Sequence, residues 1–224
     1  MKWEKFNKLD YLSQTFDNSQ VCVVLFHGYG ADASDLAGLA NVFQLPQPVD
    51  WFFPQGVLQV PIGPMMSGRA WFQLRVSDFD DLAQGNSLPG AVNEETEKVI
   101  SQAVEWLNHL GRQYEKVIIG GFSQGAILTS HAFYRLNFSP RALLLLSGYL
   151  VAPQVFPSLA EAHKVPFFQC HGRQDPVLPL AGAVKLFNQL KELGLKGTWF
   201  EFSGGHEIPL DALAELQKFL KGLL

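Results

Sequence analysis

The chain has 224 residues, of which 47% are hydrophobic and 17% are charged, and its formal net charge is −4. This length is typical of one α/β domain with a large core, and we expect a single domain over residues 1–224. Lys and Arg do not cluster, which makes nucleic acids and anionic membrane surfaces poor candidate partners. No apolar run approaches the roughly 18 residues of a transmembrane helix, and residues 1–5 lack the apolar core of a signal peptide.

The two cysteines, Cys22 and Cys170, both lie in apolar runs that are typical of buried strands. They lack the spacing of a metal site, and we expect two buried free thiols. Free thiols are typical of a reducing compartment. Since a signal peptide and a membrane span are also missing from the sequence, we expect a soluble cytoplasmic protein.

The first part of the chain contains short apolar runs separated by polar turns. The polar and aromatic residues 3–18 predict an edge hairpin, and the six apolar residues 21–26 predict a buried strand. Residues 34–43 have helical spacing, with Ser34 as the candidate N-cap. Residues 49–53 predict a second buried strand, which a proline ends.

Regular spacing lapses over residues 55–90, where prolines and glycines interrupt the pattern. An aromatic segment at residues 69–74 and an acidic segment at residues 77–82 lie within this region. A loop-rich excursion of this length in a compact domain is usually functional or mobile. We therefore interpret residues 55–90 as the loop-rich rim and partial lid of a pocket.

The second part of the chain alternates between predicted strands and predicted helices. Strands are expected at residues 116–120, 142–146, 166–171 and, as an edge strand, 196–202. Helices are expected at residues 93–110, 126–134, 180–193 and 210–224. Apolar strands that are separated by helices imply a sheet buried on both faces. The sequence therefore predicts the α/β class, with a mostly parallel central sheet and helices on both faces.

Gly-Phe-Ser-Gln-Gly at residues 121–125 joins a predicted strand directly to a predicted helix. In this context Gly-x-Ser-x-Gly forms a nucleophile elbow, a sharp turn that exposes the serine above the edge of the sheet. The turn strains the backbone at the serine, and a Cβ on either glycine would clash. The pattern indicates Ser123 as a nucleophile; a glycine-rich turn with an ordinary serine is the alternative.

A serine hydroxyl needs a base to remove its proton and an acid to orient that base. On a sheet of this kind the chain order is serine, then Asp or Glu, then histidine. Asp175 lies just after a predicted strand, where open parallel sheets place their functional groups. His206 is the only later histidine and lies in a glycine-rich turn, which completes the expected triad with Ser123. We expect His171 to be structural, and His131 either to face solvent or to be satisfied within its helix.

An oxyanion that develops during acyl transfer needs two N–H donors. The backbone N–H of Gln124 lies at the expected start of a helix, where negative charge is favoured. The loop after the first buried strand is the usual source of the second donor. That loop is His-Gly-Tyr-Gly at residues 27–30, and the Tyr29 backbone N–H is the predicted donor. An ordinary turn after a strand is the alternative.

Six motifs occur along the chain in a fixed order. They are Leu-Phe-His-Gly-Tyr-Gly-Ala-Asp at residues 25–32, Arg-Ala-Trp-Phe at 69–72, Gly-Gly-Phe-Ser-Gln-Gly-Ala at 120–126, Ser-Gly-Tyr-Leu at 147–150, His-Gly-Arg-Gln-Asp-Pro-Val-Leu-Pro at 171–179 and Gly-His-Glu-Ile at 205–208. Together they resemble the carboxylesterase, acyl-protein thioesterase and phospholipase–carboxylesterase group of α/β-hydrolases. The resemblance implies the α/β-hydrolase fold, a triad of Ser123, Asp175 and His206, and backbone donors at Tyr29 and Gln124.

Three residues depart from the usual motifs of that family. Gln73 stands where the family usually has Asp, Ala126 where it often has Gly, and Tyr29 where Leu is more usual. The change to Gln73 is expected to affect how the rim segment is anchored. The change to Tyr29 is expected to narrow the entrance for the acyl group. None of them touches the triad, so they bear on substrate preference.

The expected activity is hydrolysis of carboxylic esters or thioesters with an apolar acyl group, through an acyl-enzyme and with no metal or organic cofactor. The expected partner is a small-molecule ester or an acylated substrate. An apolar acyl pocket is predicted from Trp71, Phe72, Leu74, Phe79, Leu82 and Val177, with core packing as the alternative for Phe72 and Leu74. A lysophospholipase or an acyl-protein deacylase is the alternative enzyme. A non-catalytic binding protein of the same fold is the alternative of another class, and the apolar rim also suits a homodimer contact.

Overall fold

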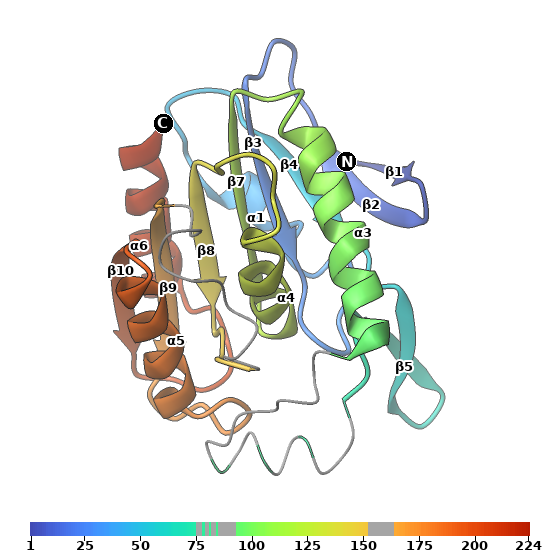
Figure 1. Cartoon of the computed structure of the whole chain (residues 1–224), viewed down its shortest axis with the longest axis vertical. Coiled ribbons are helices and arrows are strands. Elements are labelled where there is room, and N and C mark those ends of the chain that lie inside the picture. The colour runs from blue at the N-terminus through green and yellow to red at the C-terminus, as the bar shows by residue number, and fades with distance from the viewer. Residues whose placement is uncertain (75–77, 79–80, 82–83, 85–92, 152–163) are drawn as a thin grey trace.

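The computed structural model describes residues 1–74, 78, 81, 84, 93–151 and 164–224. An eight-stranded sheet forms the centre of the described chain (Figure 1). Its strand order is β1 (Lys2–Phe6), β2 (Leu9–Gln14), β4 (Asp50–Pro54), β3 (Val21–Phe26), β7 (Lys116–Phe122), β8 (Ala142–Leu146), β9 (Pro166–Gly172) and β10 (Lys196–Phe202).

The direction of the strands decides where functional side chains meet. The strands β4, β3, β7, β8, β9 and β10 each pair in parallel with the next one in this order. At the β4 edge, β1 and β2 form an antiparallel hairpin, and β2 pairs antiparallel with β4. The predicted edge hairpin and the predicted edge strand are both confirmed. Because neighbouring parallel strands share one carboxyl edge, the loops after β3, β7, β9 and β10 emerge on the same side of the sheet.

Helices cover both faces of the sheet, as predicted. The longer helices are α3 (Glu94–Leu110), α4 (Gln124–Phe133), α5 (Leu180–Glu192) and α6 (Leu210–Leu223). The first three lie on the near face in Figure 1 and share one hydrophobic cluster, whereas α6 belongs to a second cluster. The strand β3 contributes to both, since Val24 and Phe26 pack in the first cluster and Val23 and Leu25 in the second. This alternation is what a strand buried on both faces requires.

The helix predicted over residues 34–43 is wrong in length. Only α1 (Leu39–Val42) is helical, and residues 33–38 form turns. The Asp32 carboxylate accepts hydrogen bonds from the backbone N–H and the hydroxyl of Ser34, at 2.8 and 2.5 Å. A short acidic side chain that bonds the backbone two residues later stabilises a turn in competition with a helix.

The loop-rich description of residues 55–90 is wrong for its first part. Here β5 (Leu58–Gly63) and β6 (Met66–Ala70) form a two-stranded antiparallel hairpin. Its register shifts between Pro61 and Gly63. Only Val60 in β5 and Ala70 in β6 are buried, so the hairpin lacks the apolar alternation that identifies a strand in a sequence. A two-stranded ribbon tolerates proline because each strand has one unpaired edge.

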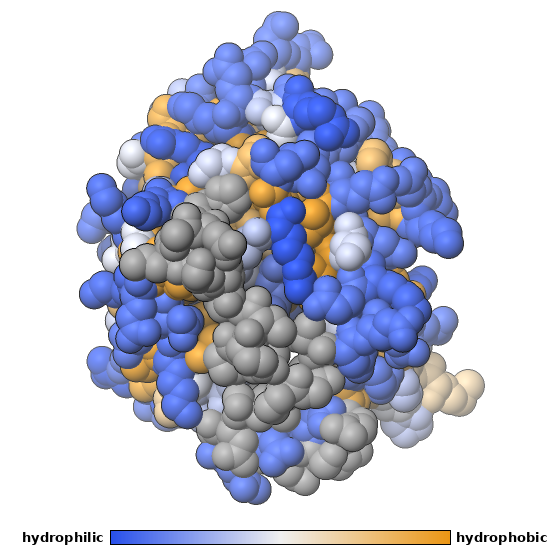
Figure 2. Space-filling model, in the orientation of Figure 1, coloured by the Kyte–Doolittle hydropathy of each residue, from blue (hydrophilic) through white to orange (hydrophobic). Residues whose placement is uncertain are grey.

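The surface of the face in Figure 1 is mostly hydrophilic, as Figure 2 shows. Among the described residues, no helix combines the length and the apolarity that crossing a bilayer requires. Cys22 and Cys170 are buried free thiols, as predicted. Burial raises the pKa of the Cys170 thiol to about 12 and that of Cys22 well above its ordinary value.

The helix α4 is buried along its whole length, including its histidine. His131 is only 4% exposed, which rules out the predicted solvent-facing alternative. Burial lowers the pKa of His131 to about 4, and the positive charge of Arg135 adds to this effect. The imidazole is therefore neutral in the folded protein at neutral pH.

The lowered pKa of His131 makes the free energy of unfolding depend on pH. The unfolded chain protonates His131 near pH 6.5, whereas the folded chain does so only near pH 4. Stability should therefore fall as the pH drops from 6.5 to 4, by up to about 3 kcal/mol for this group. We expect His131→Gln to flatten the pH dependence seen in urea unfolding.

His109 on α3 is the matched control, because it is partly exposed. His109→Gln should keep the pH slope of the wild-type protein. An equal slope for the wild-type protein and His131→Gln would contradict the assignment.

Candidate active site

The turn between β7 and α4 holds Ser123 in an unusual backbone conformation. Ser123 has φ 54° and ψ −118°, and α4 begins at the next residue. A non-glycine residue in such a region costs about 1–3 kcal/mol and persists only where the surroundings enforce it. Here the Ser123 N–H donates to the Leu146 carbonyl at 2.9 Å, which ties the turn to the end of β8. The strain predicted from the sequence lies on Ser123 itself.

The two glycines of the elbow are needed for close packing. Neither Gly121 nor Gly125 has a positive φ. A Cβ on Gly125 would lie 2.0 Å from the Phe26 carbonyl oxygen, and one on Gly121 would lie 2.4 Å from the Gly125 carbonyl carbon. Real Cβ contacts never approach this closely, so any larger residue would push the elbow away from the end of β3. The predicted clash is therefore confirmed.

His206 lies between Ser123 and Asp175. Its Nε2 atom is 2.8 Å from the Ser123 Oγ, and its Nδ1 atom is 2.7 Å from the Asp175 Oδ2. Ser123 follows β7, Asp175 follows β9 and His206 follows β10. The three residues therefore meet at the shared carboxyl edge of the parallel strands. Side chains that are 83 and 31 residues apart in the chain thus form one hydrogen-bonded series.

Backbone contacts hold the two loops of this series together. The Arg173 N–H donates to the Phe202 carbonyl and the Gln174 N–H to the Gly204 carbonyl, both at 2.9 Å. A Cβ on Gly172 would lie 2.2 Å from the Gly205 carbonyl oxygen, so glycine permits this approach. The loop that carries the aspartate is therefore fixed against the loop that carries the histidine.

The surroundings of Asp175 favour its ionised form. Burial opposes ionisation, but hydrogen bonds from His206 and from the backbone N–H groups of Leu178 and Val177 outweigh it and lower the pKa of Asp175. Both backbone donors reach Oδ1 at 2.8 Å, which leaves Oδ2 to face His206. A carboxylate accepts a proton-bearing Nδ1, so the Nε2 atom of His206 is the one left to accept from the serine hydroxyl.

His171 also contacts Asp175, a role that the sequence analysis missed. Its side chain is fully buried, and its Nε2 lies 2.6 Å from the Leu178 carbonyl and 3.3 Å from the Asp175 Oδ2. Since a carbonyl only accepts, Nε2 carries the proton. Burial lowers the pKa of His171, so the imidazole is neutral and its Nε2 proton bonds to the Leu178 carbonyl, while the ring lies against the carboxylate. The pattern of residues 171–175 contained both groups, but nothing in it indicated that they touch.

The loop after β3 lies directly beside the elbow. A Cβ on Gly28 would be 3.3 Å from the Ser123 Cβ, which places this backbone against the serine. The His27 Nδ1–H donates to the Gly28 carbonyl at 2.7 Å, and the Gly56 N–H donates to the His27 Nε2 at 2.9 Å. Burial lowers the pKa of His27, in agreement with a neutral ring that both donates and accepts. Donation by the Tyr29 and Gln124 N–H groups to an oxyanion stays a prediction.

The side chain of Gln124 connects the elbow to the rim. Its Oε1 accepts from the Trp71 N–H at 2.9 Å, and its Nε2 donates to the Phe72 carbonyl at 2.7 Å. The Trp71 indole N–H donates to the His27 carbonyl at 2.8 Å. The sequence analysis assigned a role only to the backbone of Gln124. The one available signal was a polar amide at the start of a mostly apolar helix.

Comparison with known proteins identifies the family. A sequence model of the phospholipase/carboxylesterase family matches residues 12–224. The chain belongs to this family. Acyl-protein thioesterase 1 of Saccharomyces cerevisiae is 27% identical over 89% of this chain and 91% of its own length. Acyl-protein thioesterase 1 of Gibberella zeae is 25% identical, over 89% and 88% of the two chains.

A solved structure supports the same assignment. The crystal structure of esterase PE8 superposes with a TM-score of 0.79 and 27% identity, covering 96% of this chain and 97% of that chain. The chain is therefore an α/β-hydrolase of the phospholipase/carboxylesterase family, an enzyme that acts on ester bonds. The fold and the family that the motifs predicted are confirmed.

The residues that were predicted to line an acyl pocket fall into two groups. Trp71, Phe72 and Leu74 lie in the hydrophobic core, with 0%, 5% and 9% exposure, and Val177 packs against it. Phe79 and Leu82 lie outside the described residues. Core packing was the stated alternative for Phe72 and Leu74, and the structure agrees with it. A contact of any of the six with an acyl chain stays a prediction.

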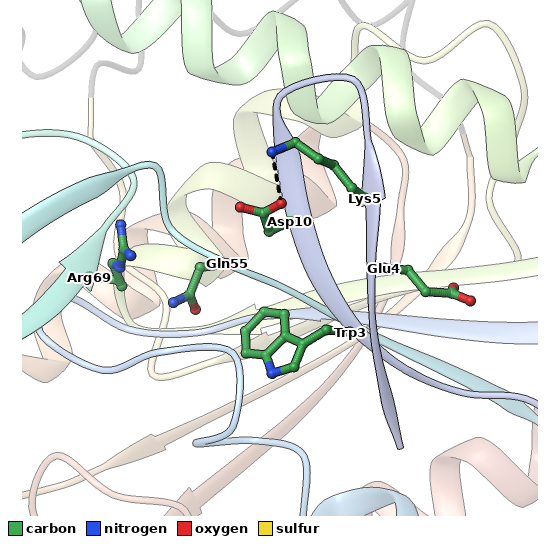
Figure 3. A pocket seen from close by; sticks show the side chains of 6 residues that line it. All are labelled: Trp3, Glu4, Lys5, Asp10, Gln55 and Arg69. Atoms are coloured by element: carbon green, nitrogen blue, oxygen red, sulfur yellow. Dashed lines mark ion pairs between the residues drawn. The ribbon is translucent and has the colours of Figure 1, made fainter.

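Two hollows lie near the rim and the elbow. A hollow of about 590 Å³ beside the N-terminal hairpin is lined by Trp3, Glu4, Lys5, Asp10, Gln55 and Arg69 (Figure 3). It contains none of the triad residues, and Lys5 pairs with Asp10 within it at 3.2 Å. A second hollow, of about 390 Å³, reaches His206.

We expect Gln124→Met to loosen the rim of this hydrolase. The substitution leaves the Trp71 N–H and the Phe72 carbonyl without their partner, and unpaired buried groups cost about 1–3 kcal/mol each. Urea unfolding should show a loss of about 2–6 kcal/mol for the two groups together, and the Trp71 amide should exchange faster with deuterium. Gln113→Met, at an exposed position, is the control. Unchanged exchange at Trp71 would contradict the role of this amide.

Proposed function

We propose that this hydrolase cleaves carboxylic esters or thioesters with an apolar acyl group, using Ser123 as nucleophile, His206 as base and Asp175 as the orienting acid. The observation that carries the proposal is the position of His206, which reaches the serine hydroxyl with one ring nitrogen and the aspartate with the other. A serine without such a neighbour is a poor nucleophile at neutral pH.

In the first step the His206 Nε2 accepts the hydroxyl proton while the Ser123 Oγ bonds to the substrate carbonyl carbon. The imidazolium that forms is stabilised by ionised Asp175, whose lowered pKa keeps it charged at neutral pH. The carbonyl oxygen becomes an oxyanion, which the backbone N–H groups of Tyr29 and Gln124 hold. The C–O or C–S bond then breaks as Nε2 returns its proton to the departing atom.

The second step releases the acid. Water takes the place of the alcohol or thiol, and the His206 Nε2 removes its proton as it attacks the acyl carbon. Collapse of this second intermediate returns the proton to the Ser123 Oγ and frees the carboxylic acid. The strained backbone at Ser123 is fixed before substrate binds, so the nucleophile needs no reorganisation at the moment of attack.

Acyl-protein thioesterase activity is the second candidate. It is supported by relatives that carry that name and that match this chain over most of its length. Comparing kcat/KM for a short p-nitrophenyl ester, a lysophospholipid and a palmitoylated-cysteine peptide would rank the substrate classes. A clear preference for the peptide would favour protein deacylation, and a preference for the short ester would favour a general carboxylesterase.

We expect Ser123→Ala to lower p-nitrophenyl ester turnover by about 10⁶-fold, because no other group then forms the acyl-enzyme. Ser203→Ala is the control, since Ser203 is an exposed serine three residues from His206. A fluorophosphonate probe should label the wild-type protein and Ser203→Ala but not Ser123→Ala. Retained turnover in Ser123→Ala would remove the serine from this role, and failure to label a folded wild-type protein would favour a non-catalytic binding protein.

We expect Asp175→Asn to lower kcat by about 10⁴-fold while the protein stays folded. An amide in place of the carboxylate favours the wrong tautomer of His206 and no longer stabilises the imidazolium. Ester hydrolysis and circular dichroism would measure the two effects separately. A loss of less than about tenfold would contradict the orienting role.

A further inference from the structure

We propose that the hollow beside His206 binds the alcohol or thiol part of the substrate. Its walls favour leaving groups with aliphatic carbon, and its carboxylates favour a positively charged leaving group over a negatively charged one. This inference rests on the proposed function of Ser123 and His206. The hollow, called the leaving-group groove below, has a volume of about 390 Å³. Its apolar walls are Leu36, Leu39, Val42, Phe122, Ile208 and Leu213.

The leaving-group groove starts at the reacting side chains. His206 itself lines it, and so does Phe122, the residue immediately before the nucleophile. The Phe122 and His206 rings are in contact, with their centroids 4.9 Å apart. One wall comes from the turns before α1 and from α1 itself, and the other from the loop after His206 and the start of α6. The groove therefore lies on the histidine side of Ser123.

The reaction decides which part of an ester lies on that side. His206 Nε2 accepts the proton of Ser123 and must return it to the departing oxygen or sulfur. A proton moves directly only between atoms about 2.6–3.2 Å apart, so the departing atom lies beside Nε2 when the bond to the acyl carbon breaks. The carbonyl oxygen must point instead toward the backbone N–H groups of Tyr29 and Gln124. The rest of the alcohol or thiol then extends from Nε2 along the leaving-group groove.

The apolar walls suit an apolar leaving group. Val42 on α1 is 52% exposed, and Leu39 and Leu213 are partly exposed. When a ligand covers exposed aliphatic side chains of a groove, its binding free energy becomes more favourable by about 0.8 kcal/mol for each buried CH₂ group. This part of the surface therefore favours longer aliphatic alcohols and thiols over short ones.

Two carboxylates set the charge preference. Asp35 and Glu207 line the groove, and no Lys or Arg is among its described lining residues. Neither carboxylate forms an ion pair with the described part of the chain. Glu207 is held in place by the Gly205 N–H, which donates to its Oε1 at 3.3 Å. Two negative charges at an apolar groove, without an ion-pair partner among the residues that the structure describes, attract a cationic group and repel an anionic one.

The first experiment separates the leaving-group side from the acyl side. One substrate series keeps the butanoyl group and changes the alcohol from ethanol to hexanol; the other keeps ethanol and changes the acid from acetic to hexanoic. Wild-type kcat/KM should rise along the alcohol series. Val42→Gln should lower the hexyl-to-ethyl ratio by about fivefold and leave the acid series unchanged. Val184→Gln, at an exposed position on α5, should change neither series. Equal effects of Val42→Gln on both series, or on neither, would overturn the proposal.

The second experiment tests the charge preference with three butanoate esters of similar size. Their alcohols end in trimethylammonium (choline), tert-butyl (3,3-dimethylbutanol) or carboxylate (4-hydroxybutanoic acid). At low salt, kcat/KM should fall in this order by about two- to fivefold per step, as expected for exposed charges. The differences should shrink at ~0.5 M NaCl. They should also shrink in the double variant Asp35→Asn and Glu207→Gln, which keeps the side-chain oxygen that binds the Gly205 N–H. Equal rates for the three esters in the wild-type protein would overturn the charge preference.

The two proposals fail in different ways. Hydrolysis that survives Ser123→Ala would remove the proposed function and the groove assignment with it. Hydrolysis that depends on Ser123 but ignores the length and the charge of the alcohol would leave the proposed function intact and overturn only the leaving-group groove.

Discussion

The close contact between the elbow and the end of β3 is the constraint on which the rest of the site depends. Gly125 lies so near the Phe26 carbonyl that no side chain fits between them. This contact lets α4 start directly at the sheet, and it forces the positive φ at Ser123. The same contact places the loop at Gly28 against the serine, so that the proposed nucleophile and the loop predicted to hold an oxyanion are positioned by one packing interaction.

The proposed triad depends on a second set of constraints, which act on loops. Asp175 receives hydrogen bonds from two backbone N–H groups and from His206, although it is buried, and His171 lies against its carboxylate. Backbone hydrogen bonds tie its loop to the loop of His206. A buried carboxylate that is fully hydrogen-bonded stays ionised and immobile, which is what an orienting acid requires. The histidine is thus positioned through the contacts of its turn with the Asp175 loop at the sheet edge.

Gln124 joins these two features to the rim. Its backbone lies at the start of α4, and its side chain binds the backbone of Trp71 and Phe72. Trp71 in turn donates to the carbonyl of His27, and the Gly30 N–H donates to the Arg69 carbonyl. The elbow, the loop after β3 and the segment at residues 69–72 therefore form one hydrogen-bonded unit. A shift in any of them is transmitted to the place where an oxyanion would form.

The sequence by itself determined the α/β class, most strands and helices, and the three residues that meet at the sheet edge. Strand and helix patterns are local, and the order of Ser123, Asp175 and His206 follows from the connectivity of such sheets. The hairpin at residues 58–70 was missed because its side chains are mostly exposed, and the helix at residues 34–43 was predicted too long because Asp32 stabilises a turn before it. Only the tertiary structure decided that His171 touches Asp175, that Gln124 binds the rim, and that an apolar groove with two carboxylates opens beside His206. These contacts and this groove depend on distances between segments that lie far apart in the chain. Packing sets such distances, and the spacing of residues in the sequence does not reveal them.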